Sequence, residues 1–502
     1  MAKKVKPLFD SNDWTFERLR IAEDAIKEIA FEELHLDVYP NQIEIISADQ
    51  MLDAYSSHGL PLMYNHWSFG KHFLKDSYGY RKGLSGLAYE IVINSSPCIS
   101  YLMEDNSMTM QALVIAHAAY GHNHFFKNNY MFKQWTDAEA ILDYLAFAKN
   151  YISKCEEKYG VGDVEYTLDA CHAIMHYGVD RYERPSKPSA EKEKHLQEER
   201  EARVQREAND LWRTLPASNT SATKTLDELM QADRYPKEPQ ENLLYFLEKN
   251  SPYLESWQRE ILRITRKIAQ YFYPQYQTKL MNEGWASFTH YYIMNRLWEK
   301  GLLTDGQLLE FIHSHSGVLA QRDYSSKYYS GFNPYALGFA MFTDIRRICE
   351  NPTAEDREYF PHMAGAPWVE TCLDAVKNYR DESFIAQFLS PKLIRDWRLF
   401  EITNKEEEDY VMISSIQNQR GYNNIRNTLS RQYSIAKMFP NIQILNSNLK
   451  GDRTLELQYT SKDNEELDLK SASQVVDYVS LLWGYKCILV DEVGTPISIA
   501  RY

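Results

Sequence analysis

The sequence predicts a mainly α-helical protein, in which a large helical body is followed by a smaller C-terminal α+β domain. Amphipathic segments with apolar residues at helical spacing recur through most of the chain before residue 391. A stretch rich in charged residues, and then in Pro, Ser and Thr, interrupts these segments near the middle of the chain. After residue 391, short runs of β-forming residues alternate with two further helical segments, which is typical of an α+β domain.

Length and composition place the chain among ordinary globular proteins. It has 502 residues, of which 44% are hydrophobic and 25% are charged, so we expect several domains with a sizeable core. The formal net charge is −14 and the basic residues are scattered. A nucleic-acid partner would need a concentrated basic face. We therefore expect no nucleic-acid binding.

Three further features predict a cytoplasmic protein. Residues 1–10 are charged and lack the apolar stretch of a secretory signal. No window approaches the 18 or so consecutive apolar residues that a membrane span requires. The six cysteines are dispersed without a CxxC pair, which is typical of reduced, buried thiols.

Composition divides the chain into four parts. We expect residues 1–188 to form the first part of the helical body and residues 240–396 to form the second part. Between them, residues 189–239 are expected to form an exposed charged helix followed by a Pro/Ser/Thr-rich connection, with 189–235 the most mobile internal part of the chain. Residues 397–502 are expected to form the C-terminal α+β domain.

Hydrophobic periodicity gives the expected elements. Helices of the body are expected at 14–34, 108–119, 137–158, 164–177, 240–249, 253–271, 278–300, 305–314, 335–349, 353–360 and 367–379. The expected C-terminal elements are strands at 399–403, 410–416, 442–446, 454–459 and 486–490, and helices at 422–433 and 473–483. Residues 450–452 (KGD) are expected to form a hairpin turn. Residues 88–93 are rich in β-forming residues but short, so their state stays open.

Three histidines lie close together at the end of the apolar segment 108–119. His117, His122 and His124 occur within eight residues, next to Gly121. Imidazoles at such spacing can converge on a metal ion. Residues five apart lie about 140° apart around an ideal helix, so His117 and His122 share a face only if the helix ends or bulges near Gly121. The segment is not an HExxH motif, because Ala118 follows His117 and the carboxylate that serves as a base is missing there.

A second apolar helix carries Glu283 and His290. These residues are seven apart and therefore lie on one face, two turns from each other. Two histidines from one helix and a carboxylate from another are a common metal-binding set, and a buried carboxylate needs a positive partner. We therefore expect a divalent metal, with zinc the first candidate, bound by His117, His122, Glu283 and His290, with His124 either a further ligand or a hydrogen-bond donor to a ligand. Glu283 is also expected to be the catalytic carboxylate. A buried polar network without metal, or coincidence, remains open as an alternative.

Several longer blocks of the sequence resemble the SpoVR (stage V sporulation protein R) family. They are residues 64–71 (YNHWSFGK), 121–129 (GHNHFFKNN), 281–286 (MNEGWA) and 333–338 (NPYALG). The resemblance runs from about residue 12 to beyond residue 400. It implies a link to formation of the spore cortex, a peptidoglycan layer, or to a stress response, and a PrkA-type serine protein kinase as a partner.

Two classes of function follow. The EGW block that begins at Glu283 is similar to the second-helix motif of some zincin-like peptidases, so the body could have a zincin-like core and act as a metal-dependent hydrolase of the amidase or peptidase type. Ala118 counts against ordinary peptidase chemistry. The alternative is a non-catalytic regulatory protein that works as a scaffold with a PrkA-type kinase.

Overall fold

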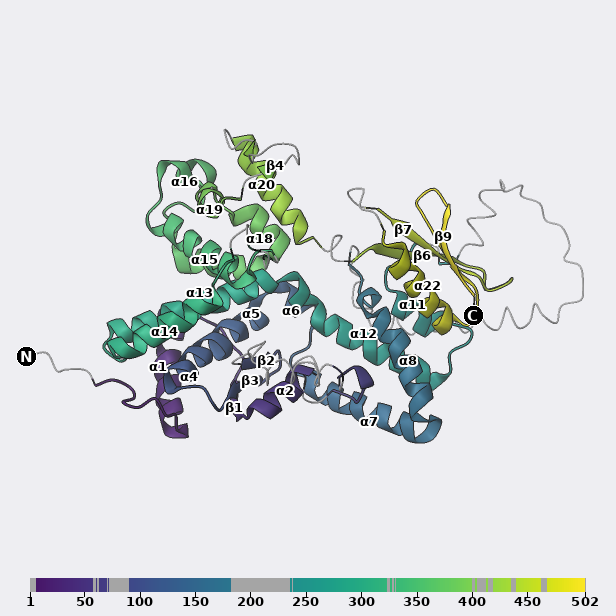
Figure 1. The fold of residues 1–502 in the computed structure, drawn as a ribbon, viewed down its shortest axis with the longest axis horizontal. Coiled ribbons are helices and arrows are strands. Elements are labelled where there is room, and N and C mark those ends of the chain that lie inside the picture. Colours follow the sequence, from purple (N-terminus) through teal and green to yellow (C-terminus); the bar gives the residue numbers. More distant parts are fainter. Residues whose placement is uncertain are drawn as a thin grey trace, which may run out of the picture. The chain divides into compact units, whose positions relative to one another are not determined.

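The computed structural model describes residues 6–56, 60, 63–69, 71, 90–181, 235–236, 238–322, 326, 329, 331–399, 402–403, 412–413, 419–434, 439–461 and 467–501. The described chain is mostly helical and has a small C-terminal sheet, so the fold class is confirmed in this coarse form (Figure 1). Contacts between residues divide the chain into two compact units. The first unit comprises residues 1–153 and 271–434, and the second comprises residues 154–270 and 435–502.

The first unit contains most of the helices. Its elements before residue 153 are α1 (Phe16–Glu32), β1 (Asn41–Ile46), α2 (Ala48–Ser56), β2 (Glu90–Ile93), β3 (Cys98–Met103), α4 (Met108–Ile115), η1 (Ala116–His122), α5 (Asn123–Asn128), α6 (Tyr130–Trp135) and most of α7 (Ile141–Tyr159). Its later elements are the end of α12 (Ser256–Gln277), then α13 (Lys279–Glu299), α14 (Asp305–Val318), α15 (Pro334–Glu350), α16 (Ala354–Tyr359), α17 (Trp368–Asn378), α18 (Asp381–Phe388), α19 (Pro391–Asp396), β4 (Ile402–Thr403), β5 (Met412–Ile413) and α20 (Gln419–Gln432).

A three-stranded sheet stands beside the helices of this unit. Its strand order is β1-β3-β2, with β1 parallel and β2 antiparallel to β3. Strand β2 settles the state of residues 90–93, but β1 and β3 were not expected from the sequence. Both are six residues long, and runs this short carry too few periods to separate strand from helix. The sheet matters for function because β2 contacts η1.

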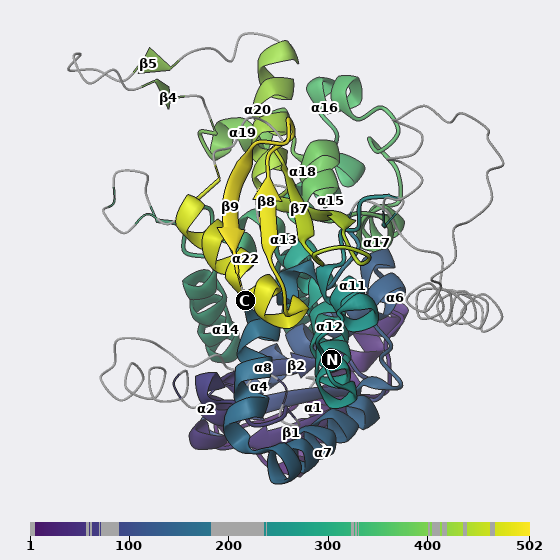
Figure 2. The same ribbon diagram turned by 90° about the vertical axis from the view of Figure 1, so that its right-hand side faces the viewer.

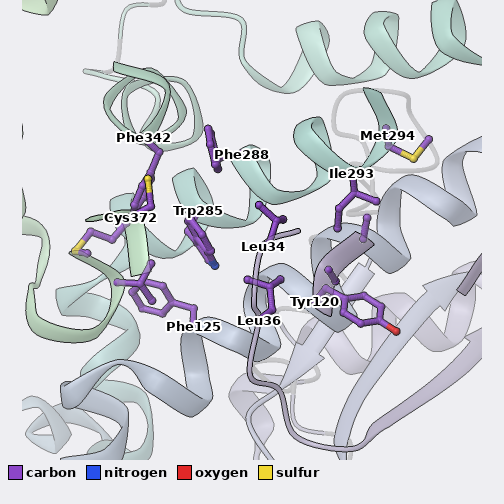
Figure 3. Packing of buried hydrophobic residues seen from close by; sticks show 14 of the residues in the cluster. Leu34, Leu36, Tyr120, Phe125, Trp285, Phe288, Ile293, Met294, Phe342 and Cys372 are labelled. Atoms are coloured by element: carbon purple, nitrogen blue, oxygen red, sulfur yellow. The ribbon is translucent and has the colours of Figure 1, made fainter. Parts of the chain in front are cut away.

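Helix α13 lies at the centre of the first unit, where it packs against both η1 and α15. Its Trp285 is buried, and the ring centroids of Trp285 and Phe342 of α15 are 5.3 Å apart (Figure 3). A Cβ atom added to Gly284 would fall far inside van der Waals contact with the backbone of Gly338 in α15. The two glycines therefore allow α13 and α15 to approach backbone to backbone, which fixes the position of the residue beside Gly284, the candidate ligand Glu283.

Asp381 holds the start of α13. Its carboxylate oxygens accept hydrogen bonds of 2.9 Å from the backbone N–H groups of Leu280 and Met281. Thr278, which precedes the helix, makes no side-chain cap of its own. The first N–H groups of a helix have no partner within it, so this buried carboxylate supplies the missing acceptors.

Replacement of Asp381 by alanine is therefore expected to lower the free energy of unfolding by about 2–4 kcal/mol, since two buried N–H donors lose their acceptors. Urea denaturation followed by circular dichroism measures this loss. Asp374→Ala is the matched control, because Asp374 is exposed on α17 and bonds only Asn378; it should change stability by less than about 0.5 kcal/mol. Equal effects of the two substitutions would contradict the capping role.

The second unit combines helices with the C-terminal sheet. Its elements are the end of α7, then α8 (Val161–Ala173), η2 (Met175–Tyr177), α11 (Leu243–Asn250), most of α12, β6 (Asn441–Ser447), β7 (Leu455–Thr460), α22 (Leu469–Trp483), β8 (Cys487–Val490) and β9 (Pro496–Ala500). The sheet has the order β6-β7-β8-β9, and the predicted turn at 450–452 joins the antiparallel strands β6 and β7. Helix α22 packs on β8, β9 and α8 (Figure 2). Its Trp483 is fully buried.

The division into units differs from the predicted boundary at 396/397. The helix expected at 422–433 is α20, but α20 packs on α18 in the first unit, where Ser430 donates a hydrogen bond of 2.7 Å to the carbonyl of Glu382. Conversely, α8 and α11 from the predicted helical body join the C-terminal sheet in the second unit. Hydrophobic periodicity shows that a helix exists but does not show which neighbour covers its apolar face.

Two expectations remain, one on the middle of the chain and one on membrane spans. The charged helix expected at the start of 189–239, and the mobility expected for 189–235, fall almost wholly outside the described residues. Across the part of the chain that the structure describes, no helix is long and apolar enough to cross a membrane.

Candidate metal centre

A π-helix brings the first two histidines together. The expected helix at 108–119 ends as an α-helix at Ile115, and η1 continues it with the wider turns of i→i+5 hydrogen bonding. The wider turn reduces the angle between residues five apart, so the rings of His117 and His122 meet and their centroids are 4.6 Å apart. His117 and His122 could share a face only if the helix ended or bulged near Gly121, and the structure has this bulge.

Helix α13 brings Glu283 to the same point. The Nε2 atom of His122 is 3.5 Å from Oε2 of Glu283, and Nε2 of His117 is 3.9 Å from it. This approach depends on Gly121, because a Cβ atom there would lie 2.6 Å from Cα of Ala286 in α13. The close packing of η1 on α13 therefore brings these three predicted residues together.

Sequence reasoning missed a fourth member, Glu90. This residue begins strand β2, and its Oε1 atom is 3.1 Å from Nε2 of His117. One ligand atom from each of Glu90, His117 and His122 lies within 4.8 Å of the others. A lone acid at the head of an apolar run (EIVI) is the only signal that the sequence offered. Its partner lies 27 positions away in the chain, in an element that local periodicity cannot connect to it.

The four groups shift each other's pKa values. Burial raises the pKa of Glu90 to about 7. Burial also acts to raise the pKa of Glu283, but His117 and His122 outweigh it and the net shift is downward. Burial acts to lower the pKa of His117, yet Glu90 and Glu283 raise it overall. Burial and the neighbouring His117 lower the pKa of His122 to about 4. Glu283 is therefore the more readily ionised carboxylate of the pair.

The other two predicted histidines lie outside this group of four, although His290 lines the same cavity. Nδ1 of His290 is 2.8 Å from Nδ1 of His117, on the side of that ring away from the carboxylates, and Nε2 of His290 is 2.7 Å from Nδ1 of His315. Burial lowers the pKa of His290 well below its usual value and that of His315 to about 4. His124 stands apart from the group, because its Nδ1 accepts a hydrogen bond of 3.0 Å from the backbone N–H of Asp37.

Three of the separations among the four groups suit a metal ion. Zinc bonds to nitrogen and oxygen are near 2.0–2.1 Å, so neighbouring ligand atoms of a tetrahedral site lie about 3.3 Å apart. The distance is 3.1 Å from Nε2 of His117 to Oε1 of Glu90. It is 3.5 Å from Nε2 of His122, and 3.9 Å from Nε2 of His117, to Oε2 of Glu283. These distances lie on either side of about 3.3 Å. Within the described chain, Oε2 of Glu90 and Oε2 of Glu283 are buried without a hydrogen-bond donor. Imidazole and carboxylate together suit zinc, iron or manganese.

A cavity of about 770 Å³ gives access to these groups. Glu90, His117, His122 and Glu283 all line it, and much of the remaining wall is apolar, including the rest of strand β2. A cavity of this size with a few convergent polar groups is typical of a small-molecule or peptide site.

Comparison with known proteins places the chain in a family. The family described as "SpoVR like protein" matches residues 13–438, and "SpoVR-like C-terminal domain" matches residues 440–493. The chain is 55% identical over 492 residues to "Uncharacterized protein YcgB" of Escherichia coli (strain K12), covering 98% of this chain and 95% of that protein. No solved structure matches the chain. The sequence therefore shows that this protein belongs to the SpoVR family.

Proposed function

We propose that this protein is a metal-dependent hydrolase of amide bonds. The observation that carries the proposal is the convergence of two imidazoles and two carboxylates on the wall of one cavity, at separations that suit a divalent ion. The close approach of η1 and α13 beside a small sheet also favours a zincin-like core for the first unit. The metal, the activity and this core are all part of the proposal.

We assign His117, His122 and Glu283 as the ligands, with zinc as the first candidate. A shared ion must be within bonding reach of all its ligands, and Glu283 lies within 4 Å of both imidazole Nε2 atoms. The lowered pKa of its carboxyl also means that Glu283 is ionised, as a ligand must be. The Tyr335 side chain forms a further hydrogen bond with Glu283 and lines the cavity. This contact restrains the carboxylate.

Glu90 then supplies the base that Ala118 cannot supply. In the HExxH arrangement, a Glu on the histidine helix takes the proton from the attacking water. In this protein Glu90 of strand β2 brings a carboxylate next to His117, on the wall of the cavity. A divalent ion, when bound, would polarise the substrate carbonyl and activate the water. Glu90 would accept the proton of that water and pass it to the leaving amine.

The substrate class follows from the cavity and the family. Much of the cavity wall is apolar, and the polar groups converge at one place on it, as in sites for small organic substrates. The family resemblance implies a link to the spore cortex, so peptide amides of peptidoglycan precursors are the first class to test. Without metal binding, the scaffold role with a PrkA-type serine kinase would be the better proposal.

Matched substitutions of the two carboxylates test this assignment. Glu283→Gln is expected to weaken zinc binding by more than about 100-fold, whereas Glu90→Gln is expected to keep zinc within about 10-fold and to abolish hydrolysis. Zinc affinity is measured by competition with a chromogenic chelator. Hydrolysis is measured by mass spectrometry on a mixture of peptides and muropeptides, with and without a chelator. Loss of zinc in Glu90→Gln, with none in Glu283→Gln, would reverse the two roles. Cleavage that continues in the chelator would contradict the proposal.

A further inference from the structure

Three buried imidazoles form a continuous chain that starts at the candidate metal centre. His117 of η1, His290 of α13 and His315 of α14 are each at most 5% exposed. Their nitrogen atoms meet at 2.8 Å (Nδ1 of His117 to Nδ1 of His290) and 2.7 Å (Nε2 of His290 to Nδ1 of His315). Both nitrogens of His290 are therefore engaged in hydrogen bonds with other histidines.

We infer that His290 is a positioning residue for His117 and not a metal ligand. This inference depends on the proposed metal site. His290 accepts a hydrogen bond from the Nδ1 proton of His117. Nε2 of His117 then carries no proton and offers its lone pair to the ion. Metal-bound histidines usually give their second N–H to a carboxylate, a carbonyl or water. In this chain Nδ1 of His117 faces another imidazole, which is itself held by a third, and His117 also forms a hydrogen bond with the backbone of Ala286.

The donor and acceptor roles follow step by step. A neutral imidazole has one N–H and one lone pair. If Nε2 of His117 offers its lone pair to a cation, Nδ1 must carry the proton and donate it to Nδ1 of His290. The proton of His290 is then on Nε2, which donates to Nδ1 of His315. The last proton of the chain is therefore on Nε2 of His315.

The surroundings of His315 favour this direction. Its Nε2 atom is buried without a hydrogen-bond partner among the described residues. The ring centroids of Phe339 and Phe311 lie 4.9 and 5.6 Å from that of His315. Aromatic rings accept an N–H weakly but offer no donor to a lone pair. The direction that leaves an N–H at the end of the chain is thus the less costly one, and it is the direction that prepares Nε2 of His117 for a cation.

Position 290 allows a test by two variants of the full-length chain. His290→Leu removes the acceptor for His117. His290→Asn keeps an oxygen near the place of Nδ1, so it preserves the contact with His117 while losing the contact with His315. We expect His290→Leu to weaken zinc affinity by about 10–100-fold and His290→Asn to recover it to within about threefold of the unsubstituted protein. His315→Leu should weaken it less than His290→Leu, since His290 remains in place.

The measurement is chelator competition with zinc, and melting curves of the zinc-free variants show that each one folds. Suppose that the unsubstituted protein binds zinc and His117→Ala does not, so that the proposed metal site stands. Two results would then overturn the inference about His290. In the first, His290→Leu binds zinc as tightly as the unsubstituted protein. In the second, His290→Asn is as weak as His290→Leu, which would make His290 a ligand. If the unsubstituted protein binds no zinc, the proposed metal site fails and this inference fails with it.

Discussion

Replacing Gly284 by alanine is expected to destabilise the protein by about 3 kcal/mol or more, although alanine is the better helix former. The added methyl group would overlap the backbone of Gly338, and no rotation of a side chain can relieve a clash between two backbones. Helices α13 and α15 would have to move apart. Glu283 is the neighbour of Gly284, so the same movement should also weaken metal binding.

Gly317→Ala is the matched control for this substitution. Gly317 also lies in a helix of the first unit, α14, but a Cβ atom added there meets no other atom within 4 Å. It should stabilise the protein by about 0.5–1 kcal/mol, the ordinary gain from replacing glycine in a helix. Chemical denaturation of the two variants measures both effects. A Gly284→Ala variant as stable as Gly317→Ala would contradict the close approach of α13 and α15.

Single alanine substitutions of His117 and His122 are expected to remove high-affinity zinc binding. Each one takes away a nitrogen ligand, and the loss should exceed the roughly 100-fold effect of removing a group that only supports a ligand. Each imidazole is a partner of a buried carboxylate, so the zinc-free variants should lose stability, and melting curves show that each one folds. Isothermal titration with zinc measures the affinity.

His124→Ala is the control for these two substitutions. His124 is as buried as its neighbours and lies in the same segment, but it bonds the backbone of Asp37 and not the carboxylates. We expect this variant to lose stability by about 1–3 kcal/mol and to keep zinc affinity within about threefold. Zinc binding that depends on His124 as strongly as on His117 would contradict the arrangement of the centre.

Much of this centre could be predicted from the sequence. His117, His122 and Glu283 stood out because histidines are rare in apolar helices and a buried acid needs a partner. Gly121 indicated where the helix could change its turn. Glu90 could not be found in this way, because a single acid in a short strand shows nothing about which helix faces it. His124 was chosen by proximity in sequence, but its side chain leaves the helix in another direction.

The fold prediction was also limited by what local sequence can show. Long helices such as α13 were placed to within a residue or two, because many turns of amphipathic spacing support them. Strands β1 and β3 were missed because six residues give little periodicity. The grouping of α8 and α11 with the C-terminal sheet depends on which surfaces fit together over more than 200 positions of the chain. Such pairing is a property of packing and not of local sequence.

The metal content of the purified full-length protein tests the central claim most directly. Inductively coupled plasma mass spectrometry should find about one divalent ion per chain, as expected for one site with three protein ligands. The His117→Ala/Glu283→Gln double variant, purified in the same way and shown to be folded, should contain none above the buffer background. A folded, unsubstituted protein that carries no more metal than this variant, even after incubation with zinc, iron or manganese, would contradict the account.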